Sequence, residues 1–198
     1  VFLYNPARPV PTWGGATLMQ GEQVSLHSGP KDQRMVELRD DVLVYTSPPL
    51  ERPCLVLGQV KAHLYVSTSA VDTDWTVKLC DVWPDGRVIN ITDSILRMRY
   101  RESPFRPVLA NPGEIYLVQL DVGFVSHCFL PGHRIRIEVS SSNFPRFSRN
   151  MNVAEVPERV AIEEAQIAVQ RVYHGADHPS RILLPVQNAY LEPSSNPR

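Results

Sequence analysis

Hydrophobic and polar residues alternate at every second position through much of the chain, which is the pattern of β-strands with one buried face. In the clearest example, residues 134–140 read RIRIEVS. A longer run, residues 55–69, keeps small or branched apolar residues at every even position from 60 to 66. The pattern predicts strands at residues 40–46, 55–69, 75–82, 87–100, 115–122, 134–140 and 166–173.

A tight turn joins two of these segments. Pro84-Asp85-Gly86 lies between residues 75–82 and 87–100. Proline presets φ at the first central position and glycine tolerates a positive φ, so we expect a hairpin. Residues 155–170 carry alanines and glutamates that would also suit a helix, but the alternation that follows favours a late strand. The chain is therefore predicted to be all-β, a jelly-roll β-sandwich with at most one short helix.

A single domain accounts for the chain, because 198 residues can bury roughly 70% of their unfolded surface. We expect residues 1–190 to form one β-sandwich domain with an irregular lead-in over residues 1–15. Residues 191–198, rich in proline, serine and asparagine, are expected to form a flexible tail. The chain opens with Val1-Phe2-Leu3, without an initiator methionine or a signal segment, which is typical of a piece of a longer protein or of a mature product.

Composition and charge exclude several classes of partner. A net charge of −1 gives no electrostatic reason to expect nucleic acid or an anionic membrane. No apolar run approaches the length needed to span a bilayer. Cys54, Cys80 and Cys128 are odd in number and far apart, which argues against disulfides and a zinc site and favours a cytoplasmic location. The histidines show no ligand-like spacing, so we expect no metal and no other cofactor.

Residues 130–150 hold the side chains most suggestive of catalysis, three consecutive serines with His133 upstream. A nucleophilic serine needs a base, an orienting acid and oxyanion donors, and α/β-hydrolases present it on a G-x-S-x-G turn. The chain has no such motif. A Ser141–His133–Asp74 triad is one reading. We favour the other, in which the serines end a strand and hydrogen-bond a turn, and predict no catalytic residue in this chain.

Asp72 and Asp74 begin a group of carboxylates in the expected hairpin. A calcium site needs six or more oxygen ligands, and these two residues could contribute to one. We prefer a structural role, in which they accept backbone N–H bonds and one of them pairs with an arginine such as Arg134. Asp81 and Asn143 are assigned to the same group of structural polar residues.

The tryptophans leave one alternative function open. Trp75 shares its strand face with Val77 and Leu79 and is predicted to lie in the core. Trp13 falls in a loop and Trp83 at a hairpin end, where exposed indoles could stack on sugar rings. The alternative is therefore a free-standing carbohydrate-binding β-sandwich module.

A series of motifs along nearly the whole chain resembles, in order, one protein family. They are YNPARPVPTWGG at 4–15, DQR at 32–34, RDDVL at 39–43, SAVDTDW at 69–75, DVWPDGR at 81–87, RMRYRE at 97–102, PGEIY at 112–116 and HPSRILLPV at 178–186. The chain resembles the C-terminal domain of the cocaine esterase and X-Pro dipeptidyl-peptidase (CocE/NonD) family of serine hydrolases.

The resemblance implies a jelly-roll β-sandwich, similar to galactose-binding folds, that packs on an α/β-hydrolase domain with a helical cap. It places the Ser/His/Asp triad upstream, so this chain would be the non-catalytic part of an ester or amide hydrolase. It also implies a substrate pocket where the three domains meet. The loop after Gly14-Gly15 suggests Trp13, Leu18 and Met19 as the rim of that pocket. The domain could in addition bury a homodimer surface.

Overall fold

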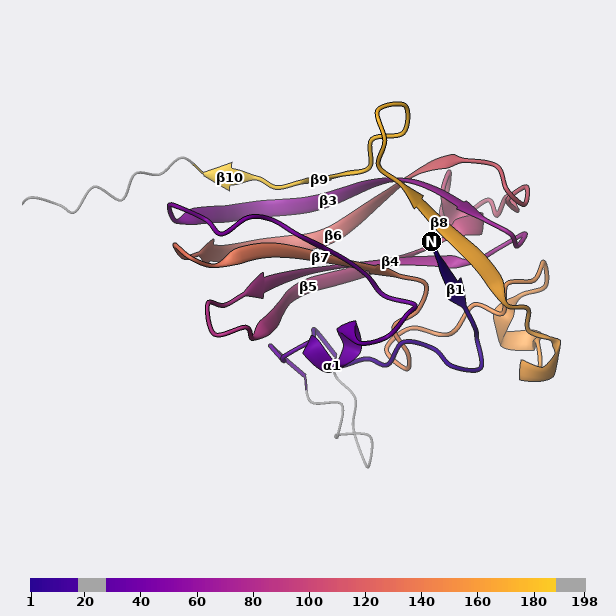
Figure 1. Cartoon of the computed structure of the whole chain (residues 1–198). Helices are drawn as coiled ribbons and strands as arrows, with labels where there is room; N and C mark the ends of the chain where they lie inside the picture. Colours follow the sequence, from indigo (N-terminus) through magenta and orange to yellow (C-terminus); the bar gives the residue numbers. More distant parts are fainter. Residues whose placement is uncertain (18–27, 188–198) are drawn as a thin grey trace, which may run out of the picture.

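The computed structural model describes residues 1–17 and 28–187, which fold into two stacked antiparallel β-sheets (Figure 1). The smaller sheet has four strands in the order β2 (Leu43–Thr46), β7 (Arg134–Ser140), β4 (Asp74–Val82) and β5 (Val88–Arg97). β4 and β5 form the predicted hairpin. At its turn the Gly86 N–H donates to the Trp83 carbonyl at 2.9 Å, and Gly86 has a φ of +88°.

The larger sheet is built around β3 (Cys54–Thr68). β6 (Tyr116–Phe129) pairs with β3 along one edge. The other edge of β3 pairs in succession with β10 (Val186–Gln187), β9 (Arg181–Leu183) and β8 (Ala168–Tyr173), and β1 (Phe2–Tyr4) then pairs with β8. One long strand therefore gathers segments that are far apart in the sequence.

The main hydrophobic core lies between the two sheets and follows the predicted alternation. Val60 and Val66 of β3 are fully buried, as are Trp75 and Val77 of β4. The ring of Phe2 meets the Trp75 indole edge-on, with the two centroids 6.3 Å apart. Each large apolar side chain contributes roughly 1.5–3 kcal/mol by leaving water. The inward face of the strands is thus the main determinant of this all-β sandwich.

The outer face of the four-stranded sheet is also covered. Cys80 and Glu138 lie on this face and are buried, and α1 (Arg34–Glu37) lies beside the sheet in Figure 1. The Lys78 ammonium donates to Glu138 Oε2 at 2.8 Å and to Gln33 Oε1 at 2.7 Å. In β4 and β7 the alternation therefore separates an apolar buried face from a polar buried face.

β6 is longer than predicted because the alternation changes phase within it. The register with β3 shifts between Val60 and Lys61, opposite Val122 and Gly123. Gly123 has a φ of +140°, and a Cβ at this position would collide with the hydroxyl of Thr92. Only glycine adopts this backbone without strain. The buried positions are therefore even-numbered before the bulge and odd-numbered after it. The alternation in the sequence is interrupted at Val122 although the strand continues.

Other differences concern short elements. β5 ends at Arg97, and the next residues form the 3₁₀ turn η2 (Met98–Tyr100). The region that could have been helical forms two 3₁₀ turns, η3 (Pro157–Arg159) and η4 (Ile162–Glu164), before β8. β1 lies within the lead-in that was expected to be irregular, and the expected tail lies outside the described residues. Within the described ranges, no helix is long and apolar enough to cross a membrane.

Candidate functional site

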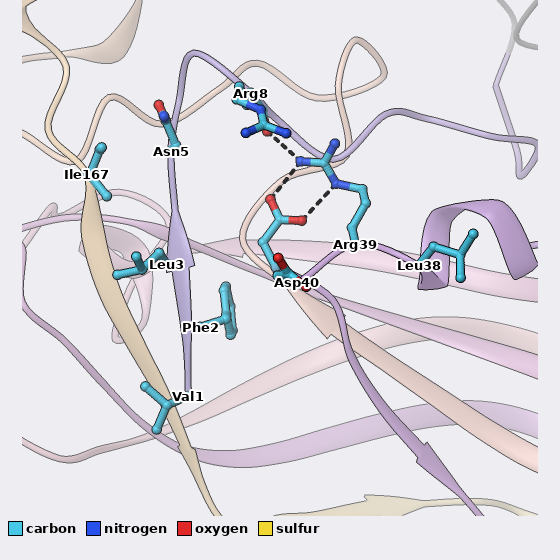
Figure 2. Close-up of a pocket in the computed structure, with 10 residues that line it drawn as sticks. Val1, Phe2, Leu3, Asn5, Arg8, Leu38, Arg39, Asp40 and Ile167 are labelled. Carbon is cyan, nitrogen blue, oxygen red and sulfur yellow. Dashed lines mark hydrogen bonds and ion pairs between the residues drawn. The ribbon is translucent and has the colours of Figure 1, made fainter.

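A groove of about 610 Å³ opens beside β1, at the edge of the larger sheet (Figure 2). We call it the N-terminal groove. β1 and the residue before β8 form one wall, and the residues that follow α1 form the other. The lining consists of Val1, Phe2, Leu3, Asn5, Arg8, Leu38, Arg39, Asp40, Asp41 and Ile167.

Both walls of the N-terminal groove expose apolar side chains. The exposed fractions are 73% for Val1, 60% for Leu3, 74% for Leu38 and 60% for Ile167. β1 buries its first and third residues in the sandwich, so its alternation turns Leu3 toward solvent. Apolar residues that gather around a surface hollow are typical of an interaction surface.

Arg39 holds the lead-in against the segment after α1. Its guanidinium donates to the two carboxylate oxygens of Asp41 at 2.7 and 2.8 Å and to the Arg8 carbonyl at 2.6 Å (Figure 2). The hydrogen bond to the Asp41 carboxylate raises the pKa of Arg39. A bidentate ion pair is geometrically specific, so Arg39 fixes the distance between the walls of the groove.

The predicted pocket rim is only partly described. Trp13 is 38% exposed, and its carbonyl accepts a hydrogen bond from Gln33 Nε2 at 2.9 Å. Gly15 and Gly29 exchange two backbone hydrogen bonds of 2.8 Å, which brings the two ends of the intervening loop together. Leu18 and Met19 lie in that loop, outside the described residues, so their place on the rim stays a prediction.

The three serines are held in structural hydrogen bonds. The Ser140 hydroxyl lies 2.5 Å from that of Thr76, Ser141 Oγ accepts from Gln170 Nε2 at 3.1 Å, and Ser142 Oγ accepts from the Val10 N–H at 2.8 Å. All three serines are buried. This agrees with the structural interpretation of the serines.

The members of the alternative triad are not brought together. His133 Nδ1 lies 2.9 Å from Asp81 Oδ1, and Asp74 pairs with Arg97. Ser141 therefore has neither of its supposed partners.

Asp72 and Asp74 form buried ion pairs with two arginines that follow one another closely in the sequence. Arg99 Nε donates to Asp72 Oδ2 at 2.7 Å, and Arg97 Nε donates to Asp74 Oδ1 at 3.0 Å. Asn150 Nδ2 bridges the two carboxylates at 2.7 and 2.9 Å. Both carboxylates are thus occupied by protein donors, which favours the structural role over a calcium site.

Burial raises the pKa of Asp74 from 3.8 to about 6, although Arg97 and Asn150 oppose the shift. The folded chain therefore binds this proton more tightly than the unfolded chain does. Protonation of Asp74 stabilises the fold, fully below about pH 4, and the contribution is lost as the pH rises through 6. We expect Asp74→Asn to remove this dependence. Relative to the variant, wild type should gain about 2–3 kcal/mol in its free energy of unfolding between pH 7 and pH 4.

Urea unfolding of wild type and Asp74→Asn at the two pH values measures this gain. Asp85→Asn is the matched control, because Asp85 is exposed and its hydrogen bonds to Arg87 lower its pKa. The control should not show a gain of the same sign. A difference between wild type and Asp74→Asn that does not change with pH would contradict the assignment.

The remaining predicted polar residues lie in separate places. Arg134 is not the partner of either aspartate, because its guanidinium donates to the Ser47 carbonyl at 3.2 Å. Asn143 Nδ2 donates to Asp93 Oδ2 at 2.7 Å. Asp81 lies between His133 and His127, whose Nε2 is 3.1 Å from Asp81 Oδ2. The structure thus does not unite these residues in one site. In the described part of the chain, no group of histidine, cysteine and acidic side chains could hold a metal ion.

The tryptophan rings differ in how accessible they are for stacking on a sugar. Trp75 is fully buried, as predicted. Trp83 is 37% exposed, but the Arg87 guanidinium lies over its ring, 4.1 Å from the centroid. A sugar would have to displace this cation from the indole face. Trp83 is therefore a poor platform for the carbohydrate-binding alternative.

The described residues thus form a two-sheet β-sandwich whose three consecutive serines are held in structural hydrogen bonds. The family model for the X-Pro dipeptidyl-peptidase C-terminal non-catalytic domain matches residues 5–183. The chain belongs to this family.

Similar proteins agree with this assignment. The cocaine esterase of Rhodococcus sp. (strain MB1 Bresler) is 51% identical over 185 residues, which is 93% of this chain and 32% of that protein. A solved α-amino acid ester hydrolase superposes with a TM-score of 0.86 at 34% identity, and an aminopeptidase from a marine sediment archaeon, Thaumarchaeota archaeon, with 0.85 at 36%. Each superposition covers 94% of this chain and 32% of the other. The chain thus spans about a third of the length of these relatives.

Proposed function

We propose that this chain packs on the α/β-hydrolase domain of a serine hydrolase and forms part of the wall of its substrate pocket. The parent enzyme would cleave an ester or amide by acyl transfer, with a triad and oxyanion hole supplied by the hydrolase domain. The observation that carries the proposal is the N-terminal groove. The groove combines exposed apolar side chains with the hydrogen bonds of Arg39 that connect its walls. The chain itself spans about a third of the length of its relatives.

The chemistry of the N-terminal groove suits a domain interface. Leu3, Leu38 and Ile167 would lose their contact with water on docking, and burying one such side chain contributes roughly 1.5–3 kcal/mol. Arg8 and Asp40 supply charged groups at its margin. An apolar centre with a polar rim is the usual composition of a protein interface. The partner we assign to the N-terminal groove is the hydrolase domain of the same parent.

The pocket wall is a second part of the proposal. Trp13 is a third exposed, and its backbone carbonyl is fixed by Gln33, which is itself buried. An anchored loop with a partly exposed indole can present a firm apolar surface to a substrate. Leu18 and Met19 follow in the same loop and complete the proposed rim.

Active-site labelling tests the catalytic part of the proposal. This chain and the full-length parent are treated with a fluorophosphonate probe and assayed with p-nitrophenyl butyrate. We expect the parent to be labelled once and to hydrolyse the ester, and this chain to do neither. Stoichiometric labelling of this chain that disappears in Ser141→Ala would overturn the proposal, because it would place the nucleophile here.

A further inference from the structure

A slot of about 190 Å³ enters between the two sheets, and residues of β2, β8 and β9 lie around it. We call it the edge slot. Its inner surface is formed by Leu64, Ile137 and Val139, which are buried in the main core. Val172 and Ile182, which are partly buried, form its walls. Unlike the N-terminal groove, the edge slot therefore reaches the apolar core of the sandwich.

The mouth of the edge slot carries two polar rings. Tyr45 pairs in register with Ile137, so its side chain lies on the inner face of the smaller sheet. The rings of Tyr45 and His174 meet edge-on, with centroids 5.9 Å apart, and within the described residues neither ring has a hydrogen bond. Burial raises the pKa of the Tyr45 hydroxyl, which keeps it protonated and neutral. The mouth thus offers a hydroxyl and an imidazole to a ligand.

The lining of the edge slot presents no permanent charge to a ligand. Among the described residues that line it, only Arg181 carries such a charge. Arg181 pairs in register with His63, whereas its neighbour Ile182 pairs with the buried Ala62. Side chains alternate along a strand, so the Arg181 guanidinium points to the outer face of the larger sheet. An ionic group that enters an apolar site without a partner loses its hydration at a high cost, so the slot favours a neutral ligand.

We propose that the edge slot binds a small neutral molecule that consists of a phenyl-sized ring and one short polar group, such as a hydroxyl. An apolar cavity of about 150 Å³ is large enough for benzene, so the slot can hold such a ring against Leu64, Ile137 and Val139. The polar group would stay at the mouth, beside Tyr45 and His174. The inference does not depend on the proposed function.

Three probes of similar shape and different charge test the assignment: benzyl alcohol, benzoate and benzylamine. For a fragment of this size we expect a Kd of about 1 mM for the alcohol. The two charged probes should bind at least about tenfold more weakly, because neither would find a counter-charge in the slot. Backbone amide shifts in NMR spectra give both the affinity and the place of binding. The largest shifts should fall on β2, β8 and β9.

Val172→Phe, which would fill the slot, should weaken the binding of benzyl alcohol at least about tenfold, and its NMR spectrum reports whether it folds. Val44→Phe is the matched control and should leave the affinity unchanged. Val44 is 38% exposed and pairs with Glu138, on the face of the smaller sheet opposite to Tyr45. If Val172→Phe does not fold, Ile182→Ala takes its place. The wider slot should bind 2-naphthalenemethanol at least about fivefold more tightly than the wild-type slot does.

Several results would overturn the assignment. These are equal affinities for the three probes, an unchanged affinity in folded Val172→Phe, or shifts centred on the N-terminal groove. The full-length parent completes the test, after a fluorophosphonate has blocked its active-site serine. Saturation-transfer NMR of benzyl alcohol should give a signal with this parent that Val172→Phe removes. An equal signal with both parents, or no signal with either, would overturn the assignment for the enzyme.

Discussion

Replacing Arg99 with methionine should lower the free energy of unfolding of this chain by about 3–5 kcal/mol. The Asp72 carboxylate is fully buried and its ion pair with Arg99 Nε measures 2.7 Å. In Arg99→Met the carboxylate keeps the backbone N–H of residue 99 and Asn150 Nδ2 as donors but loses its counter-charge. The variant also loses the hydrogen bonds of 3.0 Å that Arg99 Nη2 donates to the carbonyls of Val153 and Glu155.

Urea unfolding measures this loss, and two further variants show its cause. Arg87→Met removes an exposed partner of Asp85 and should cost at most about 1 kcal/mol. The double variant Asp72→Asn/Arg99→Met removes both buried charges and should be more stable than Arg99→Met alone, because no charge is left without a partner. A loss in Arg99→Met no larger than that in Arg87→Met would show that the buried pair is not a major contributor.

The long strands could be predicted from the sequence because their side chains alternate between the core and the opposite face of the sheet. β7 has the predicted bounds, and β3 differs from its prediction by one residue at each end. β1, β9 and β10 are only two or three residues long, too short for a pattern, and each forms by pairing with β3 or β8. Such strands depend on contacts distant in sequence, which local alternation does not report.

The arginine partner of Asp74 was missed for a specific geometric reason. Counting back from the pair Val82 and Val88 at the turn places Asp74 opposite Leu96. The register shifts by one residue between Leu79 and Cys80, so that Asp74 faces Arg97 instead. A β-bulge leaves no dependable mark in a single sequence. The sequence therefore predicted an arginine partner for one of the two carboxylates but could not identify the partner of Asp74.

The N-terminal groove could not be predicted from sequence patterns, because its walls come from segments that are distant in the sequence. The motifs at residues 4–15 and 39–43 contain most of its polar residues, but they lie about 30 positions apart. Only the hydrogen bond from Arg39 to the Arg8 carbonyl and the pairing of β1 with β8 bring the two walls together. Exposed Leu3 and Ile167 look like ordinary strand residues until their neighbours are known.

The double variant Leu3→Glu/Ile167→Glu should loosen the packing of this domain in the full-length parent. Both side chains are 60% exposed here, so the isolated chain should keep its stability within about 0.5 kcal/mol. In the parent, charges placed in an apolar interface should remove about 3 kcal/mol or more of docking energy. The midpoint of thermal inactivation of the parent should then fall by roughly 5–10 °C.

Phe105→Glu/Phe124→Glu is the matched control for this interface. These phenylalanines are 89% and 81% exposed and do not line the N-terminal groove. If exposed apolar area alone decided where the domains dock, these phenylalanines would be the stronger candidates. The comparison therefore shows whether docking depends on exposed apolar area or on position in the N-terminal groove. If the hydrolase domain docks at the N-terminal groove, the parent that carries the control substitutions should have the same midpoint of thermal inactivation as the wild-type parent. A drop in the control, with none in Leu3→Glu/Ile167→Glu, would move the interface to the surface around those rings.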